Sequence, residues 1–344
     1  MKRITMFLIL AFVVGGYLFA EGQAQAAESK VVVYAALDQK TANEWAAAFT
    51  KETGIPAEIA LQIEQAGTVS ARVKTEAANP RADVMIGGNS NVYEDLAANG
   101  LLQKYRSPLV GTAGIDPKLM DPNENWTGLW LGVVCLLYNN QRFQAEVASK
   151  GIAAPTTWDD LLNPVYKGNL VAPSPVTSGD GFLILADQVF RLGSEQAGFD
   201  YITKLNANVS QWTKGANGAI PLVSQGEDII GIAWGHDTIR QKVAGNLPIT
   251  VVFPKDAAFE LGAGGILKGA PHPAAAKKFV DFLLSQQAEQ INANNGYRYP
   301  LRNDVQMPSA MPPMSEVQIA PWNFAQAAAN LTAWQKQWSQ ITGQ

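Results

Sequence analysis

The chain has 344 residues, which exceeds an ordinary single-core domain and predicts two domains. Hydrophobic residues make up 47% and charged residues 16%, a globular composition that excludes a disordered chain. The net charge is -4 and no basic run occurs, which excludes a surface built to neutralise a phosphate backbone, so we expect no nucleic-acid partner.

The N-terminal residues have the pattern of an export signal. Lys2 and Arg3 precede an apolar stretch over residues 4–20, and residues 24–26 supply a small-x-small cleavage pattern. We therefore predict that residues 1–26 are a cleaved signal peptide. A retained membrane anchor is the alternative, because the stretch approaches the roughly 20 residues that span a bilayer. The lone cysteine, Cys135, lies far from the cleavage point, so we expect a periplasmic protein without a lipid anchor.

The first α/β unit follows directly. Val31–Tyr34 is a β-branched run typical of a buried strand. Residues 41–44 fit a capping box, and Trp45 and Phe49 then form the apolar face of a helix that ends at Gly54. A further helix opens at Gly67-Thr68.

The same alternation continues along the chain. Further strands are predicted at 84–86, 169–172 and 229–234, and further helices at 93–98, 182–192, 217–226 and from a loop at 235–237 onward. Strands that alternate with helices predict α/β units with mostly parallel sheets. Cys135 lies in an apolar run and is expected to be a small buried hydrophobe, which excludes disulfides and cysteine-based metal clusters.

Small polar residues gather where the predicted strands end and helices begin. In α/β sheets, ligands bind beyond the carboxyl ends of the strands, and helix N-termini there attract anions. The candidates are Asp38, Thr68, Asn89, Thr177, Ser178, Gly179, Asn217, His236 and Asp237. Ordinary helix capping is the alternative for any one of them. Trp234 lies just before the His236-Asp237 pair. Its ring could stack on the face of a sugar, or it could only line the wall of a cleft.

Catalytic and metal motifs are not found. His236 and His272 are the only histidines, which excludes a His-rich metal site, and His272 lies in what its composition indicates is a surface turn. Neighbouring side chains such as His236 and Asp237 usually diverge, so they do not form two members of a triad. No nucleophile elbow or phosphate loop occurs. We expect no catalytic residue, cofactor or metal ligand; an exported hydrolase stays as the alternative from another class.

The order and spacing of several segments carry a family resemblance. The chain resembles the periplasmic solute-binding proteins of ABC importers, within the group of ferric-iron binders and their organophosphate-binding relatives. The resemblance rests on residues 31–49, 67–75, 81–84, 168–182, 226–234, 264–268 and 275–283. It implies a type II-like α/β fold of two lobes with the ligand cleft between them. Lobe 1 would comprise 27–134 and 262–312, and lobe 2 would comprise 135–261 and 313–344, in a monomer.

The chain departs from the iron binders at their metal ligands. The corresponding positions are Asp38, Gly88, and His236 with Asp237, so the tyrosine pair of that group is missing. Ferric iron prefers hard anionic oxygens, and the resemblance therefore implies poor iron binding. The anion-binding loop of the group persists as residues 177–179, with Asn217 as its anion-facing asparagine. Asp180, in the same turn, would repel a phosphate unless its side chain points away.

The pattern is similar to that of hexose-phosphate binders, which have His-Asp after a strand and a Glu before a Gly-rich strand. Glu260 takes the last position. The resemblance implies that Thr68, Ser178 and Gly179 hold a phosphate, while His236, Asp237, Glu260 and Asp38 take sugar hydroxyls. We predict a receptor that delivers a hexose phosphate to an inner-membrane ABC permease. A 2-aminoethylphosphonate receptor and a ferric-iron receptor are the alternatives.

Overall fold

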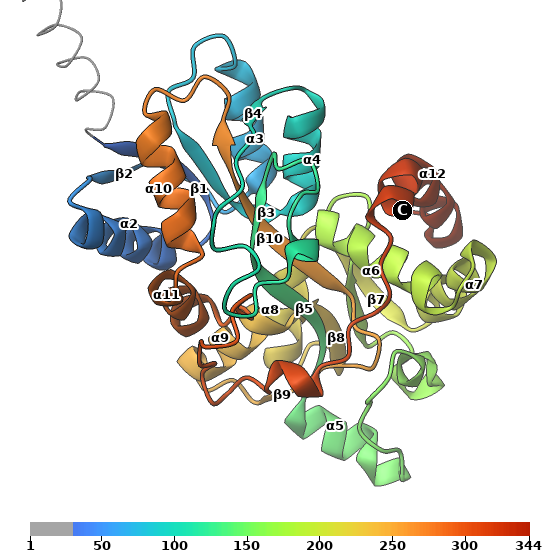
Figure 1. Ribbon diagram of the computed structural model, residues 1–344. Helices are drawn as coiled ribbons and strands as arrows, with labels where there is room; N and C mark the ends of the chain where they lie inside the picture. Colours follow the sequence, from blue (N-terminus) through green and yellow to red (C-terminus); the bar gives the residue numbers. More distant parts are fainter. Residues whose placement is uncertain (1–29) are drawn as a thin grey trace, which may run out of the picture. The chain divides into compact units, whose positions relative to one another are not determined.

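The computed structural model describes residues 30–344 as an α/β protein that divides into two compact units (Figure 1). The predicted signal peptide, residues 1–26, lies outside the described residues. Unit 1 comprises the described residues up to Leu129, with Gly262–Ile291 and Leu301–Val305. Unit 2 comprises Trp130–Leu261, Asn292–Pro300 and Gln306–Gln344.

The sheet of unit 1 combines parallel and antiparallel strands. β1 (Val31–Ala36) pairs in parallel with β2 (Ala57–Gln62) and β3 (Val84–Asn89). β10 (Phe259–Leu267) enters the unit at Gly262 and runs antiparallel to β3 and to the short β4 (Leu102–Gln103). All of β1 is buried, which requires that both faces of this sheet are covered.

Helices supply that cover. α2 (Gln39–Thr53) packs against β2 and α10 (Pro273–Leu283) against β1, while α3 (Ala66–Thr75) and α4 (Ser90–Ala98) pack against β3 (Figure 1). Phe49 of α2 packs edge-on against Phe279 and Phe282 of α10, with ring centroids 5.0 and 5.6 Å apart. α11 (Gln286–Gly296) follows α10.

The sheet of unit 2 has the order β7-β6-β8-β5-β9. β6 (Leu170–Pro173) pairs in parallel with β7 (Val209–Thr213) and β8 (Ile230–Trp234). β5 (Thr127–Asn139) pairs antiparallel with β8 and with β9 (Ile249–Val252). The prediction of parallel sheets thus holds for the strands that feed helices, while β5 and β10 add antiparallel pairs that their apolar runs did not indicate.

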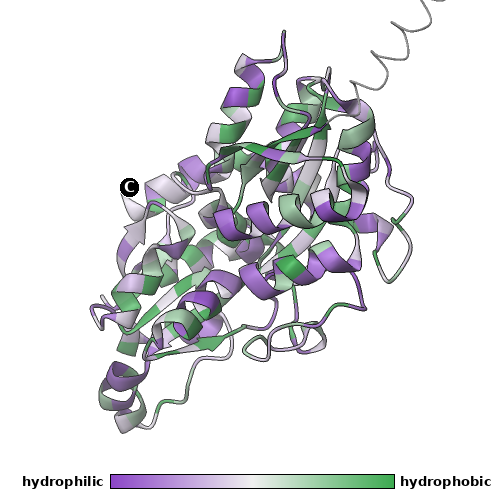
Figure 2. Cartoon of the chain, turned by 90° about the vertical axis from the view of Figure 1, so that its left-hand side faces the viewer, coloured by the Kyte–Doolittle hydropathy of each residue, from purple (hydrophilic) through white to green (hydrophobic). Residues whose placement is uncertain are grey.

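Successive residues of these strands belong to two cores, as the period of two in a strand requires. Leu136, Leu170 and Ile232 pack with α6 (Gly179–Arg191), α7 (Glu195–Asn206) and α12 (Phe324–Thr342). Leu137 and Val171 face the other way, toward α8 (Ala219–Ser224). Figure 2 shows the strands largely green between helices that also carry purple.

Two tryptophans of α12 belong to the first of these cores. Trp334 and Trp338 of α12 are buried, and their rings lie 5.9 Å from Phe190 and 5.0 Å from Trp212. Cys135 is fully buried, and burial raises the pKa of its thiol to about 12, so it is the inert hydrophobe that the sequence predicts.

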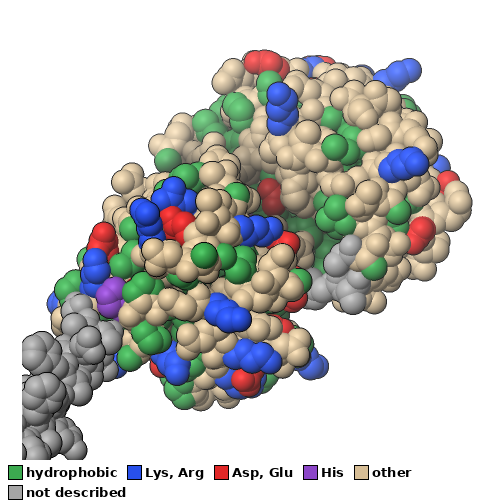
Figure 3. All heavy atoms as spheres, turned by 90° about the horizontal axis from the view of Figure 1, so that it is seen from above, with side chains coloured by type: hydrophobic (Ala, Val, Ile, Leu, Met, Phe, Trp, Pro, Cys, Tyr) green, Lys and Arg blue, Asp and Glu red, His purple; other side chains and the backbone are tan. Residues whose placement is uncertain are grey.

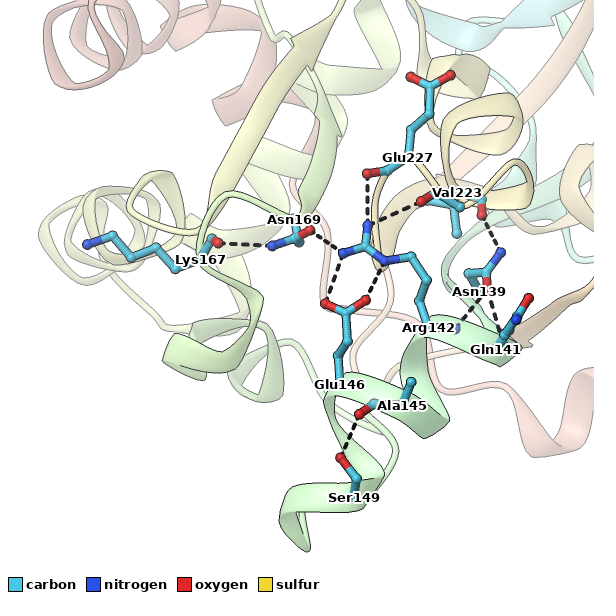
Figure 4. Close-up of polar contacts among 11 residues, drawn as sticks. Asn139, Gln141, Arg142, Ala145, Glu146, Ser149, Lys167, Asn169, Val223 and Glu227 are labelled. Carbon is cyan, nitrogen blue, oxygen red and sulfur yellow. Dashed lines mark hydrogen bonds and ion pairs between the residues drawn. The ribbon is translucent and has the colours of Figure 1, made fainter.

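α5 (Asn140–Glu146) is fixed to unit 2 by one guanidinium (Figure 4). Arg142 pairs with Glu146 through Nε at 2.7 Å and donates to the Asn169 side chain at 2.8 Å. It also donates to the carbonyls of Gly226 and Glu227 at 3.2 and 2.8 Å. Short 3-10 turns lie at Pro117–Leu119, Ala148–Lys150, Asp159–Leu162, Pro164–Tyr166, Ala216–Gly218 and Met314–Glu316.

The expected division into lobes differs from the observed units at three segments. Residues 130–134, 292–300 and 306–312, expected in lobe 1, belong to unit 2. The reason is a local pairing: the backbones of Leu131 and Tyr299 exchange hydrogen bonds of 2.9 and 3.0 Å. The Tyr299 hydroxyl then donates to the Pro312 carbonyl at 2.9 Å, which holds the following segment to the same unit.

Two helix starts also differ from expectation. α2 begins two residues before Thr41, because the Asp38 side chain accepts from the Thr41 amide at 2.9 Å and caps the helix itself. Residues 235–237, expected as a loop, form the first turn of α9 (Gly235–Gly245). Asp237 in that turn lies where a negative charge stabilises a helix.

Two further observations concern the helices and one face of the surface. In residues 30–344, no helix has the length and apolar character needed to cross a membrane. The described part of the face in Figure 3 carries acidic and basic side chains in scattered positions, without a broad basic field.

Phe49 provides a test of the core of unit 1. Phe49→Ala should lower the free energy of unfolding by about 3–5 kcal/mol, because it removes a fully buried ring that contacts two others. Urea denaturation measures this loss. The exposed Val243→Ala should change stability by less than about 0.5 kcal/mol, and an equally small effect of Phe49→Ala would contradict the packing described here.

Candidate functional site

Unit 1 brings its predicted site residues to the carboxyl ends of its parallel strands. Asp38 follows β1 and caps α2, and Asn89 ends β3 and precedes α4. The Asn89 Oδ1 is buried and has no hydrogen-bond partner among the described residues. Thr68 is exposed in the first turn of α3. One carboxylate oxygen of Asp38 therefore caps α2, as the capping interpretation expects, whereas the Asn89 side chain does not cap α4.

In unit 2, residues 177–181 lead from β6 into α6, as the sequence predicts. Ser178 is the N-cap, and its hydroxyl accepts from the Gly181 amide at 3.3 Å. Gly179 begins the helix and is exposed, as is Thr177. A side chain on Gly181 would clash with the Ser174 carbonyl, so glycine is required for this tight turn. The first turn of α6 therefore presents amide groups at its start.

The Asp237 carboxylate, at the start of α9, is held from two sides. Its Oδ1 accepts from Arg240 Nη2 at 2.7 Å, and its Oδ2 accepts from Asn217 Nδ2 at 2.7 Å. Asn217 thus directs its amide donor at a carboxylate of the protein itself, while its Oδ1 is buried and meets no hydrogen-bond partner within the described part of the chain. The amide nitrogen of Asn217 is therefore engaged by Asp237 in this structure, and its anion-facing role stays a prediction.

His236 and Trp234 form a stacked pair beside Asp237. The two rings lie 5.7 Å apart with an angle of 25° between their planes. His236 Nε2 lies 3.5 Å from Asp237 Oδ2. The two side chains therefore approach each other, although neighbouring side chains were expected to diverge. The first helical turn bends both side chains toward one side, which an extended chain would not do. Trp234 is buried in the core of unit 2 and packs against the His236 ring.

Glu260 lies against one face of β5. Trp130 donates its Nε1 proton to Glu260 Oε1 across 3.5 Å. Two residues along the same strand, a Cβ on Gly132 would lie 2.8 Å from Glu260 Oε1 and 3.0 Å from His236 Cε1. Alternate residues of a strand share one face. The missing side chain of Gly132 therefore leaves the space in which Glu260 and His236 come together.

Arg298 completes the cluster. It is 7% exposed, its Cζ lies 4.9 Å from the centre of the Trp130 ring, and its Nη1 donates to Asn292 Oδ1 at 3.1 Å. The sequence-based prediction did not include Trp130 as a site residue, nor Gly132, Arg240 and Arg298. Arg240 could have been found from its i,i+3 spacing to Asp237, which favours an ion pair on a helix. No sequence signal connects Arg298 with this site.

The three carboxylates of the cluster titrate differently because their surroundings differ. Burial raises the pKa of Asp180 to about 6, with a further contribution from Asp237, while hydrogen bonds from Trp234 and Ser178 oppose the rise. Burial and the charge of Asp180 raise the pKa of Glu260 to about 8. Arg298 and Trp130 act against that rise.

Asp237 has the opposite shift. Burial alone would raise the pKa of the Asp237 carboxyl. The charges of His236, Arg298 and Arg240 outweigh burial and hold this pKa well below its usual range. Asp180 is thus electrostatically coupled to Asp237 and Glu260, and its ionised form would add negative charge at the start of α6.

Comparisons with known proteins define the family. Residues 79–328 match the model of the bacterial extracellular solute-binding proteins, and the chain belongs to this family. A Salmonella typhimurium protein that is provisionally named a 2-aminoethylphosphonate-binding periplasmic protein is 28% identical over 307 residues, 86% of each chain.

Solved structures of periplasmic binding proteins share the fold of this chain. The periplasmic binding protein AfuA from Actinobacillus pleuropneumoniae, solved with exogenous fructose-6-phosphate bound, aligns with a TM-score of 0.77 and 26% identity, over 91% of this chain and 98% of its own. The periplasmic binding protein P5PA aligns with a TM-score of 0.74 and 27% identity, over 90% and 99% of the two chains. Iron-bound HitA from Pseudomonas aeruginosa shares the fold at 24% identity and a TM-score of 0.75, over 90% and 99%.

The class of protein follows from these observations. The chain has the α/β fold of two-lobed periplasmic binding proteins, and it is a solute-binding receptor of an ABC importer. Its named relatives are binding proteins rather than enzymes. Within residues 30–344, no group of three or more His, Cys, Asp or Glu side chains is arranged to hold a metal ion.

The raised pKa of Glu260 makes the stability of the ligand-free protein depend on pH. Between the ordinary value of 4.5 and about 8, the folded protein keeps a proton that the unfolded chain has lost, so raising the pH favours unfolding. Glu260→Gln should remove this part of the decline, as measured by urea denaturation across that range. Glu289 of unit 1 also has a pKa raised to about 8 by burial. The fall in stability with rising pH that is due to Glu289 should therefore persist in this variant.

An unchanged pH dependence in Glu260→Gln would show that Glu260 is ionised throughout and would contradict the environment described. Glu289→Gln serves as the matched control, because it should remove a decline of the same sign without touching the cluster in unit 2.

Proposed function

We propose that the protein is a periplasmic receptor for a hexose phosphate, which it delivers to its ABC permease. The observation that carries this proposal is the cluster of Asp180, Asp237 and Glu260 with Arg298 in unit 2. Carboxylates are the strongest acceptors for hydroxyl groups, and a sugar presents several hydroxyls to such a cluster. The bound fructose-6-phosphate of AfuA supports the same ligand class.

The phosphate would bind where α6 begins. The first turn of this helix offers the amides of Gly179 and Asp180 and the exposed hydroxyl of Thr177, all of which suit an anion. Asp180 would repel the phosphate when ionised. Its raised pKa of about 6 reduces that repulsion, because a neutral carboxyl is more accessible here than at an ordinary aspartate. Thr68 and Ser178 keep their proposed roles as further donors, and Asp38 keeps its proposed role at the sugar hydroxyls.

A phosphonate that carries an amine is the second candidate. The carboxylates of the cluster outnumber its guanidinium groups, and an ammonium group could pair with Glu260. The Salmonella relative with the 2-aminoethylphosphonate name favours this candidate. The two ligands differ at one end only, since both carry a dianionic phosphorus group. The test must therefore address the carboxylate end of the site.

Export and assembly belong to the same proposal. We propose that residues 1–26 are removed as a signal peptide and that the mature protein acts as a periplasmic monomer. Native mass spectrometry of protein purified without added ligand would give both the mass of the chain and the mass of any retained solute. A mass increment of a hexose phosphate supports the proposal, and an increment of another solute contradicts it.

Glu260→Gln separates the two ends of the ligand. The variant should bind glucose 6-phosphate about ten- to a hundredfold more weakly, because a charge-assisted hydrogen bond contributes about 1.5–3 kcal/mol, while inorganic phosphate should bind almost unchanged. Isothermal titration calorimetry measures both. If the wild type binds 2-aminoethylphosphonate but not glucose 6-phosphate, the amine candidate replaces the hexose phosphate.

Ferric iron provides a separate test. The ligand positions of the iron binders are occupied here by Asp38, Gly88, His236 and Asp237, so tyrosinate ligands are missing from them. Ferric citrate should therefore produce no visible charge-transfer band in the purified protein. A coloured complex with stoichiometric iron would reject the phosphate-based proposal.

A further inference from the structure

Resting on the hexose-phosphate function proposed above, we propose that Arg298 determines the specificity of this receptor. Arg298 supplies from within the protein the positive charge that the acidic cluster requires. The site then accepts the neutral hydroxyl end of a sugar and rejects an ammonium group at the same place.

The position of Arg298 is built into unit 2. Its side chain is buried, stacks on the Trp130 ring at 4.9 Å, and is oriented by a 3.1 Å hydrogen bond to Asn292 Oδ1. A side chain on Gly296 would clash with Arg298 Nη1, so the preceding turn of α11 leaves room for the guanidinium. A planar guanidinium that stacks on an aromatic ring is held in one orientation, which a lysine ammonium would not be.

Trp130 connects this cation with the acidic cluster. The face of the indole ring carries the guanidinium, and its Nε1 proton points at Glu260 Oε1 across 3.5 Å. Arg240 is committed to Asp237 by a 2.7 Å ion pair. Arg298 is therefore the guanidinium that acts on Glu260 as well as on Asp237.

The charges of the cluster explain the specificity. Hydroxyl groups are neutral and can donate to Glu260 and Asp237 without disturbing the balance with Arg298. An ammonium group would add a second positive charge beside the buried guanidinium of Arg298. The like charges would repel each other, and the ligand would have to displace the stacked arginine.

The binding test compares glucose 6-phosphate with 2-aminoethylphosphonate by calorimetry. In Arg298→Met, the affinity for glucose 6-phosphate should fall about tenfold, and the affinity for 2-aminoethylphosphonate should rise about tenfold, because the ligand's ammonium replaces the lost cation. Arg298→Lys keeps the charge and should keep the preference of the wild type. If Arg298→Lys changes preference as much as Arg298→Met, stacking rather than charge sets the specificity, and the proposal is overturned.

Arg191→Met is the matched control. Arg191 is also a guanidinium of unit 2 that stacks on an aromatic ring, 4.6 Å from the centre of Tyr201, with an ion pair to Asp159. Its removal should lower stability but leave the ratio of the two affinities unchanged. A change of this ratio in Arg191→Met equal to that in Arg298→Met would overturn the proposal, because general loosening of unit 2 would then explain both.

A second measurement needs no ligand. Asp180, Asp237, Arg298 and Trp130 face Glu260, and His236, Arg240 and Asn217 face Asp237. Removal of Arg298 leaves Glu260 harder to ionise, so the pH range over which stability declines should extend upward in Arg298→Met relative to Arg298→Lys, which keeps the charge. Urea denaturation across pH measures this extension.

The two measurements separate the inference from the function on which it rests. A wild type that binds neither ligand, together with a shifted pH profile in Arg298→Met, would reject the hexose-phosphate function and retain Arg298 as the cation of the cluster. Equal pH profiles in Arg298→Met and Arg298→Lys would overturn the inference, whichever ligand the wild type binds. A wild type that prefers 2-aminoethylphosphonate would overturn it as well.

Discussion

The burial of carboxylates is the constraint on which the site of this protein depends. A carboxylate removed from water must gain a hydrogen bond or an opposite charge, or it takes up a proton instead. Asp237 has gained both, from Asn217 and Arg240, and stays ionised. Glu260 accepts from an indole N–H across 3.5 Å and holds its proton to higher pH. One corner of unit 2 thus contains a carboxylate that stays ionised and another that is protonated over a wider pH range.

This difference gives the two acidic residues different roles. Asp237 is satisfied by its own protein, so it serves to orient Asn217 and Arg240 as much as to contact a solute. Glu260 is held by the Trp130 indole N–H across 3.5 Å and is therefore expected to gain more from a hydroxyl donor. A ligand that donates to Glu260 favours its ionised form, so binding should release a proton at neutral pH. Binding heats measured in buffers of different ionisation enthalpy would detect that release.

Much of the fold follows from local sequence patterns. The β-branched run at Val31, the glycine after α2 and the alternation of strands with helices predict the parallel parts of both sheets, and those elements form as expected. The antiparallel contributions of β5 and β10 depend on pairings between distant residues, which periodicity cannot reveal. The same holds for Asp83, which is fully buried and contacts His272 at 2.9 Å across 189 residues of sequence. A histidine that composition assigns to a surface turn is in fact a partner of a buried carboxylate.

The candidate site likewise contains residues that local sequence predicts and residues that it does not. Residues that begin helices after strands, such as Ser178, His236 and Asp237, could be found because parallel topology brings strand ends to one edge of a sheet. Trp130, Gly132 and Arg298 could not, because their importance arises only where β5, β10 and the segment after α11 meet within unit 2. Gly132 illustrates the point: its contribution is an absent side chain, and only the positions of Glu260 and His236 show that this space is used. The specificity proposed for this receptor therefore rests on residues that lie behind the polar groups, and a family pattern of ligand-facing residues does not contain them.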